Sequence, residues 1–273
     1  MLKVKVLADN NTLIDRYYTG EPGLSLLLEA DGKKMLFDCG YSGVFIDNAQ
    51  RMGDDLAEIE RVIISHGHND HTWGLTHLIQ HFDTRKITLK PRFTAHPLIF
   101  ESKRCEGLNI GMMLSQESVA AHFTVELSSQ PLLLAENLFW LGEIPRITEP
   151  KRAVGKRLVN GAEEDDYCFD DSALAYKTTN GLVIITGCSH SGICNIVDYA
   201  RKLCGCETIV DIIGGFHMQK LSRERLSSTV SWFAANPPLT MHPCHCTDLA
   251  AKIALASALN VKEAGVGLEL KFS

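Results

Sequence analysis

The sequence predicts a layered α/β fold, and three observations support this class. Apolar strand patterns dominate the first third of the chain, strands and helices alternate from about residue 174 onward, and no short period repeats. The chain has 273 residues, of which 45% are hydrophobic and 22% charged, so it can bury a large core. This composition argues against a disordered chain or a disulfide scaffold, and we expect a single domain spanning residues 1–273.

The first third of the chain is rich in predicted strands. Four segments have strand-like patterns, namely 2–8, 24–30, 34–40 and 61–65. The dipeptide Asp31-Gly32 separates the second from the third and predicts a hairpin. A helix follows the fourth strand, because apolar residues recur there at helical spacing, at Leu75, Leu78, Ile79 and Phe82.

The pattern weakens between about residues 96 and 170, so we predict an irregular insertion there. One segment, 132–142, still resembles a strand. Within the insertion five basic residues, Arg146, Lys151, Arg152, Lys156 and Arg157, precede six acidic ones, Glu163, Glu164, Asp165, Asp166, Asp170 and Asp171. Adjacent blocks of opposite charge are typical of a solvated loop, and a loop of this length is either functional or mobile.

Regular alternation returns in the last third. Strands are predicted over 174–188, with a turn at Asn180-Gly181, and over 208–215, 239–245 and the end of 261–270. Apolar residues at helical spacing predict helices at Ile193, Ile196, Val197, Ala200 and Leu203, at Leu226, Val230 and Phe233, and at Leu249, Ile253 and Leu259.

Charge and cysteine content narrow the functional classes. The formal net charge of −6 gives no support to an electrostatic grip on nucleic acid or on an anionic membrane. The nine cysteines, an odd number, predict reduced thiols and an intracellular setting. Asp9 stands where a signal peptide would be apolar, and no stretch approaches 18 apolar residues. We therefore expect a soluble, cytoplasmic protein; the sequence does not specify its oligomeric state.

One short loop carries four potential metal ligands, in the sequence Ser65-His66-Gly67-His68-Asn69-Asp70-His71. Neutral imidazole and carboxylate bind zinc and similar divalent ions. The two histidines at 66 and 68, two apart on an extended chain, can point the same way and hold one ion. The following Asp-His pair, at the turn into the helix, is placed to hold a second ion. The alternative, a polar loop whose Asp70 or Thr72 caps the helix, leaves three histidines unexplained.

Three later strand ends deliver further histidines. They are Gly187-Cys188-Ser189-His190, Gly214-Gly215-Phe216-His217 and Met241-His242-Pro243-Cys244-His245-Cys246. Sites in open α/β sheets gather where strands end and loops begin, so we expect these segments to converge with the first loop.

These motifs resemble the metallo-β-lactamase superfamily. His66-x-His68-x-Asp70-His71 after an apolar strand is similar to the signature of that superfamily, and Asp38-Cys39-Gly40 is similar to its upstream Asp-x-Gly element. The segments 186–192, 214–217 and 243–246, with Ile144-Pro145-Arg146, resemble the branch of dihydropterin–ribofuranosylaminobenzene phosphate synthase-like proteins. The resemblance runs from Asp38 to His245 and implies an αββα sandwich with a metal centre at one edge between two sheets.

The resemblance also implies a ligand set. By it His66, His68 and His190 hold a first metal, Asp70, His71 and His245 hold a second, and Asp38 supports the ligand loop. Many members place a metal-bridging Asp where this chain has Cys188 or His190. Either Cys188 bridges as a thiolate or the metals share only water, and a small buried cysteine at a tight turn is an equally open interpretation. The expected cofactors are two divalent ions, zinc first, with manganese or iron as alternatives.

The other histidines and cysteines have weaker claims on chemistry. His217 follows two glycines that permit close approach, so we predict that it contacts substrate and orients the leaving group. We expect no function for His77, His81, His96, His122 and His242. The pairs Cys204/Cys206 and Cys244/Cys246 would suit a structural zinc, but cysteine packed as a small apolar residue is the simpler interpretation.

Arg146, Lys151 and Arg152 are candidates for binding a substrate anion, since guanidinium groups match phosphate and carboxylate; a solvated basic loop is the alternative. The resemblance points to a phosphorylated small molecule as substrate.

The sequence thus predicts a binuclear metal-dependent hydrolase, or a related phosphoryl- or pyrophosphoryl-displacing enzyme, acting on a small anionic metabolite through a metal-bound hydroxide. Asp70 is expected to be both a ligand and a proton acceptor. A nuclease or cyclic-nucleotide phosphodiesterase of the same fold is one alternative, although it would need a positive groove. A metal-binding redox or sensor protein that uses the surplus cysteines is another.

Overall fold

The computed structural model describes all residues from 1 to 273, and its first sheet contains seven strands. In spatial order they are β17 (Glu269–Phe272), β1 (Leu2–Ala8), β2 (Ser25–Ala30), β3 (Lys33–Phe37), β4 (Arg61–Ile63), β5 (Arg92–Ala95) and β8 (Thr124–Leu127). The sheet is antiparallel from β17 to β3 and parallel from β3 to β8. Asp31 and Gly32, with φ of 52° and 81°, form the predicted hairpin between β2 and β3.

The second sheet contains six strands, and the three at one edge are parallel to one another. The order is β16 (Thr240–Cys244), β15 (Ile209–Gly215), β14 (Gly181–Thr186), β13 (Ala173–Thr178), β10 (Leu138–Trp140) and β9 (Leu132–Leu133). Helix α5 (Ile193–Cys204) connects β14 to β15, α6 (Arg223–Ala235) connects β15 to β16, and α7 (Leu249–Ala256) follows β16. The carboxyl ends of β14, β15 and β16 therefore point to the same edge.

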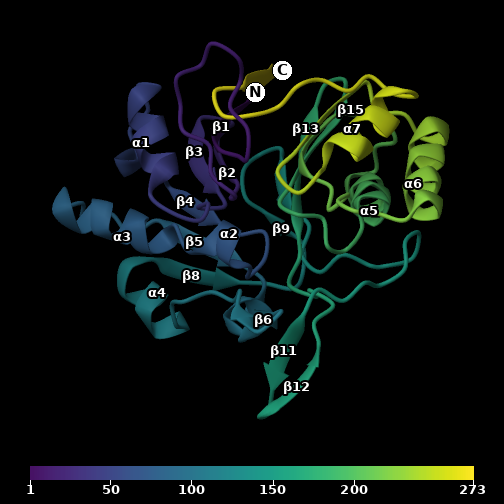
Figure 1. The fold of residues 1–273 in the computed structure, drawn as a ribbon. Coiled ribbons are helices and arrows are strands. Elements are labelled where there is room, and N and C mark those ends of the chain that lie inside the picture. The colour runs from purple at the N-terminus through teal and green to yellow at the C-terminus, as the bar shows by residue number, and fades with distance from the viewer.

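The two sheets stack face to face and helices cover both outer faces (Figure 1). Helices α1 (Val44–Arg51), α3 (Leu75–Thr84) and α4 (Gln116–His122) cover the first sheet, while α5, α6 and α7 cover the second. Phe37 and Trp140 belong to the apolar layer between the sheets, Leu78 to the layer under the first helices and Ile184 to the layer under the second. The predicted αββα sandwich is confirmed. None of the helices combines the length and apolar character needed to cross a bilayer.

The segment 96–170 is more regular than the sequence pattern predicts. It contributes β8 to the first sheet, the β9–β10 hairpin to the second, and all of a third, four-stranded sheet. The third sheet runs in the order β12 (Ala162–Asp165), β11 (Lys156–Val159), β6 (Lys103–Cys105) and β7 (Leu108–Asn109). The β11–β12 hairpin projects from the body of the molecule (Figure 1). These strands have two to four residues each, too few for an alternating pattern to be recognised.

Candidate metal centre

The loop after β4 and the loop after β14 bring three histidines together. His66 Nε2 lies 3.1 Å from both His68 Nδ1 and His190 Nε2, and these two nitrogens are also 3.1 Å apart. All three side chains are buried. Three ring nitrogens therefore face one point, the arrangement that a single metal ion requires.

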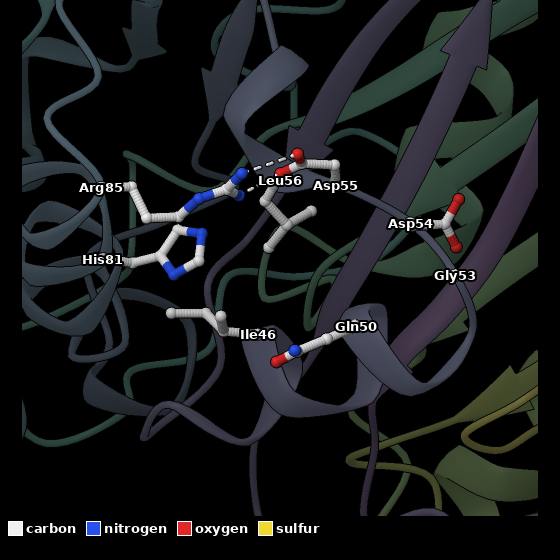
Figure 2. Close-up of a pocket in the computed structure, with 8 residues that line it drawn as sticks. All are labelled: Ile46, Gln50, Gly53, Asp54, Asp55, Leu56, His81 and Arg85. Atoms are coloured by element: carbon white, nitrogen blue, oxygen red, sulfur yellow. Dashed lines mark hydrogen bonds and ion pairs between the residues drawn. The ribbon is translucent and has the colours of Figure 1, made fainter.

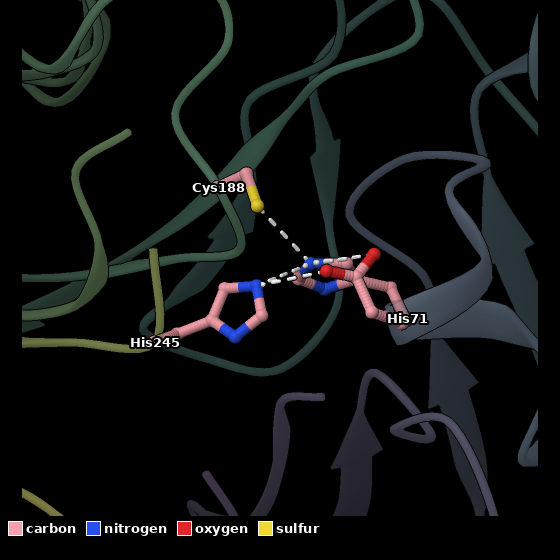
Figure 3. A group of neighbouring side chains, drawn as sticks. His71, Cys188 and His245 are labelled. Carbon is pink, nitrogen blue, oxygen red and sulfur yellow. Dashed lines mark hydrogen bonds and ion pairs between the residues drawn. The ribbon is translucent and has the colours of Figure 1, made fainter. Parts of the chain in front are cut away.

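A second group lies beside the first and adds a cysteine to the predicted residues. His71 Nε2 lies 3.1 Å from His245 Nε2 and 3.2 Å from the Cys188 sulfur (Figure 3). The carboxylate of Asp70, in the short helix α2 (Asn69–Thr72), lies 3.2 Å from His245 Nε2. Asp70, His71, Cys188 and His245 thus converge on a second point.

Asp38, at the end of β3, sets the tautomers of two of these histidines. Its Oδ2 accepts hydrogen bonds from His71 Nδ1 at 2.6 Å and from the Ser65 hydroxyl at 2.7 Å. Because that hydroxyl donates to the carboxylate, it accepts from His66 Nδ1 at 2.9 Å. Both histidines therefore carry their proton on Nδ1, and their Nε2 lone pairs face the centre. This is the supporting role that the resemblance implies for Asp38.

Two residues after β1 hold His245 in the same way. The Asn10 side-chain oxygen lies 3.2 Å from His245 Nδ1, and buried Asp9 accepts the His245 backbone N–H at 2.8 Å. His245 has a φ of 50°, and this left-handed backbone turns its ring back toward the centre. The position of Asp9 directly after a strand is a sequence signal for this role, because functional residues gather where strands end.

The two ligand groups differ in protonation state. Burial lowers the pKa of His68 to about 4 and places those of His66 and His190 well below the ordinary value, so these rings are neutral at pH 7. Burial opposes ionisation of Asp70, but His71 and His245 hold its pKa well below the usual range. Burial opposes protonation of His245, but Asp70 and Cys246 raise its pKa to about 9, so a bound cation would have to displace that proton. The three neutral rings of the first group can share only the hydrogens on their own nitrogens, whereas a metal ion among them would accept every lone pair. The residues therefore fit the metal pair that the fold family implies.

Cys188 stands at the junction of the two groups. Its sulfur belongs to the cluster with Asp70, His71 and His245 and also lies within ligand distance of His190 and His217. Burial raises the pKa of its thiol well above the ordinary value, and a neighbouring divalent ion would deprotonate it. Cys188 is buried, as both interpretations expect, and its proximity to the two sets of ligand atoms makes it a candidate bridging ligand.

His217 lies at the border of the cluster and is held by its backbone. Its φ is 47°, its N–H donates to the Cys246 sulfur at 3.2 Å, and its ring centroid is 4.3 Å from that of His190. Its Nδ1 is buried without a hydrogen-bond partner. Cys246, which the sequence analysis interpreted as packing, also donates to the Cys188 carbonyl oxygen at 3.5 Å and so belongs to the site.

The acidic block is only partly solvated, which corrects the loop prediction. Glu163, Glu164 and Asp165 are exposed in the projecting hairpin, but Asp166, Asp170 and Asp171 are buried. Asp171 accepts hydrogen bonds from the backbone N–H and the hydroxyl of Ser191, at 2.9 and 2.6 Å, beside His190. Charge order along the chain does not reveal that these carboxylates have partners in distant segments.

Buried Lys103, in β6, is the partner of two of these carboxylates. Its ammonium lies 2.8 Å from Asp166 and 3.0 Å from Asp170. Asp170 in turn accepts the Gly67 N–H, between the two metal-site histidines, at 2.7 Å, and the Cys168 sulfur lies 3.8 Å from His68 Nε2. Burial would lower the pKa of Lys103, but the two carboxylates raise it above the ordinary value, so the ammonium stays charged. This ion group supports the ligand loop through the hydrogen bond from the Gly67 N–H to Asp170. It could not be predicted from the sequence.

The three basic residues proposed for anion binding separate in the structure. Arg146 and Lys151 face the Phe169 ring, at 4.7 and 5.2 Å from its centroid. Arg152 instead donates to the His217 carbonyl oxygen at 3.1 Å, next to the histidine cluster.

The histidines to which we assigned no function lie apart from the centre. Buried His242 pairs with Asp211 at 2.9 Å, and His96 caps a short 3-10 helix. His81 lines a cavity of about 570 Å³ that contains none of the clustered residues. Figure 2 shows this cavity, lined by Ile46, Gln50, Gly53, Asp54, Asp55, Leu56, His81 and Arg85. Arg85 and Asp55 pair with each other there, at 3.0 Å, so the cavity offers no free charge to a ligand.

Comparisons with known proteins identify relatives of this chain. The model of the metallo-β-lactamase superfamily matches residues 18–102. A 7,8-dihydropterin-6-methyl-4-(β-D-ribofuranosyl)-aminobenzene-5′-phosphate synthase of Methanocaldococcus jannaschii is 30% identical over 269 residues, covering 92% of this chain and 89% of the relative. A second, uncharacterized protein of the same organism is 28% identical and covers 97% of this chain and 98% of its own.

Solved structures show the same fold. Tm1679, described as a metal-dependent hydrolase of the β-lactamase superfamily, superposes with a TM-score of 0.86 at 28% identity over 100% of both chains. A diphosphatase of the PhnP family shares the fold alone, with a TM-score of 0.54 at 15% identity over 100% of this chain and 98% of its own. On the identity with the synthase and the shared fold, this chain belongs to the metallo-β-lactamase superfamily, in its dihydropterin–ribofuranosylaminobenzene phosphate synthase-like branch.

Proposed function

We propose that this protein is a binuclear metal-dependent hydrolase, or a related phosphoryl- or pyrophosphoryl-displacing enzyme, of one domain that acts on a small phosphorylated metabolite. One observation carries the proposal. Two adjacent groups of ligand atoms are present, one of His66, His68 and His190 and one of Asp70, His71, Cys188 and His245, and Cys188 also lies near His190 of the first group. Such paired sites serve displacement at phosphoryl and acyl centres.

The residues of the proposed site divide into metal ligands and groups that act on the substrate. His66, His68 and His190 would hold the first ion, and Asp70, His71 and His245 the second, with Cys188 between them. Two divalent ions bound there would supply hydroxide at neutral pH and stabilise developing negative charge. Zinc is favoured, because imidazole and thiolate are its preferred ligands.

Two side chains remain for proton transfer and orientation. Asp70, ionised and partly open to solvent, is placed to accept a proton as well as to bind metal. His217 has a buried ring nitrogen without a partner, and we assign it the orientation of the leaving group.

The substrate class is supported by chemistry and by one relative. The name of the 30% identical synthase includes a phosphate ester, and Arg152 of this chain donates to the His217 carbonyl oxygen. A guanidinium group beside the metal centre favours the binding of a phosphorylated small molecule over that of a neutral one.

Metal reconstitution tests the proposal. The chain is stripped with a chelator and titrated with zinc, manganese or iron, and metal content is measured with hydrolysis of bis(p-nitrophenyl) phosphate. We expect about two zinc or manganese ions per chain and hydrolysis that requires them. Redox-active iron with oxygen consumption and no hydrolysis would overturn the proposal in favour of redox chemistry.

The bridging role of Cys188 has its own test. Cys188→Ser removes the soft sulfur ligand between the two groups, so we expect the metal content to fall below that of the wild type and the remaining metal to dissociate more easily. Metal analysis after dialysis measures both effects. Cys194→Ser is the matched control, since Cys194 is an equally buried cysteine outside the cluster. Unchanged metal content in Cys188→Ser would move the bridging role to water or His190.

A further inference from the structure

Two arginines from distant parts of the chain line a narrow pocket that opens beside the metal centre. Arg152 comes from the loop before β11 and Arg225 from the first turn of α6, and both line this pocket with His190 and His217. Arg152 is fixed by its hydrogen bond to the His217 carbonyl oxygen, at 3.1 Å. The sequence analysis named Arg152 but not Arg225.

The positive charge of this pair is not neutralised by the protein. Neither guanidinium forms an ion pair, and burial together with the charge of Arg225 lowers the pKa of Arg152. Glu149 also lines the pocket, but its carboxylate accepts the Cys194 N–H at 2.8 Å at the start of α5. Two guanidinium groups that line one pocket repel each other, and an anion bound between them would offset this repulsion.

The pocket continues into a larger cavity, so an anion bound there can belong to an extended molecule. The pocket itself measures only about 10 Å³, room for about one water molecule, whereas the cavity measures about 480 Å³. The two share Glu149, Arg225 and Thr229, so an anion has room where the pocket meets the cavity, at Arg225. Ser222, Ser228 and Trp232 of the α6 region also line the cavity, which adds hydroxyl groups and an aromatic face.

The loop that carries Arg152 is held in place by one side chain of α5. The Asn195 side-chain oxygen accepts the backbone N–H groups of Ile147, Thr148 and Glu149, at 3.0, 2.7 and 3.0 Å. Asn195 also donates to the Glu149 and Ser191 carbonyl oxygens, at 3.1 and 2.7 Å. These hydrogen bonds fix residues 147–149, which precede Arg152 in the same loop.

We infer that Arg152 and Arg225 bind a phosphomonoester group of the substrate, one that is not itself cleaved, and so select phosphorylated molecules for the metal centre. The inference rests on the proposed function for its role in catalysis, but the binding itself does not depend on hydrolysis. A phosphate dianion matches two guanidinium groups in charge and in hydrogen-bond geometry. His217, which Arg152 contacts, then links the bound phosphate to the reacting centre.

Phosphate titration of the zinc-loaded chain tests the inference. Inorganic phosphate is titrated by calorimetry into the wild type, Arg225→Gln, Arg152→Gln and Arg223→Gln. Arg223 is the matched control, because it is an exposed arginine in the same helical turn that does not line the pocket. We expect Kd to rise about ten- to a hundredfold in Arg225→Gln and Arg152→Gln, the loss of one charged hydrogen bond, and to stay unchanged in Arg223→Gln.

The outcomes separate this inference from the proposed function. If Arg225→Gln binds phosphate as tightly as Arg223→Gln with equal zinc content, the metals alone hold the anion and the inference is wrong. Hydrolysis of bis(p-nitrophenyl) phosphate should be the same in the control Arg223→Gln and the wild type. Absence of that hydrolysis in all proteins, with the phosphate affinity still dependent on Arg225, would overturn only the proposed function.

Discussion

His68→Ala should lose bound metal and lower hydrolytic activity by a factor of about 10³ or more, while the chain stays folded. His68 Nδ1 lies 3.1 Å from the ligand nitrogens of His66 and His190, so its removal leaves only two ligands at the first point. Loss of an ion that stabilises transition-state charge by several kcal/mol corresponds to this factor. Metal analysis and steady-state hydrolysis rates measure the two effects.

The control for His68→Ala is His77→Ala. His77 is an exposed histidine on α3, outside the cluster, so its variant should keep the wild-type metal content and rate. Far-ultraviolet circular dichroism should be the same for both variants. Full activity in His68→Ala would remove this residue from the metal centre and contradict the ligand set.

Lys103→Met should lower the free energy of unfolding by about 3–5 kcal/mol, because it leaves two buried carboxylates without their shared cation. The ammonium is buried and lies 2.8 Å from Asp166 and 3.0 Å from Asp170. Since Asp170 also holds the Gly67 N–H, we expect weaker metal binding as well. Urea unfolding of the chelator-treated protein separates the stability effect from metal binding.

Lys156→Met is the matched control for the lysine substitution. Lys156 pairs with Asp165 at 2.7 Å, but both side chains are about half exposed, at 53% and 51%. Pairs of this kind contribute about 0–1 kcal/mol, so the control variant should unfold close to the wild type. Equal losses in the two variants would show that the buried ion group has no special role.

The central ligand motif could be predicted because its members are neighbours in the sequence. His66, His68, Asp70 and His71 occupy one loop, and the alternation of an extended chain already indicates which of them can share an ion. His190, His217 and His245 could be predicted because each follows an apolar strand, and parallel strands end at one edge.

Residues that act through distant partners could not be found in this way. Lys103 precedes its carboxylate partners by more than 60 positions, and the acidic block around Asp166 is indistinguishable from a solvated loop until it is folded. Arg225 lies in the first turn of helix α6, and only the folded arrangement places it in one pocket with Arg152, His190 and His217. Hydrophobic periodicity contains no information about such pairings.

The short strands of residues 96–170 escaped prediction for a different reason. Strands of two to four residues show no periodicity, and they form here because neighbouring strands supply their hydrogen bonds. A prediction that depends on local pattern therefore interprets them as irregular chain.

The sequence by itself determined the fold class, the hairpin at Asp31-Gly32 and the types of the candidate metal ligands, because these depend on local periodicity and on residues close together in the chain. Tertiary structure alone decided that Cys188 lies between the two ligand groups, that Asp38 orients His71 and that Lys103 supports the ligand loop. The physical reason is that burial and partnership, which set charge states and hydrogen bonds, arise only when distant segments pack together.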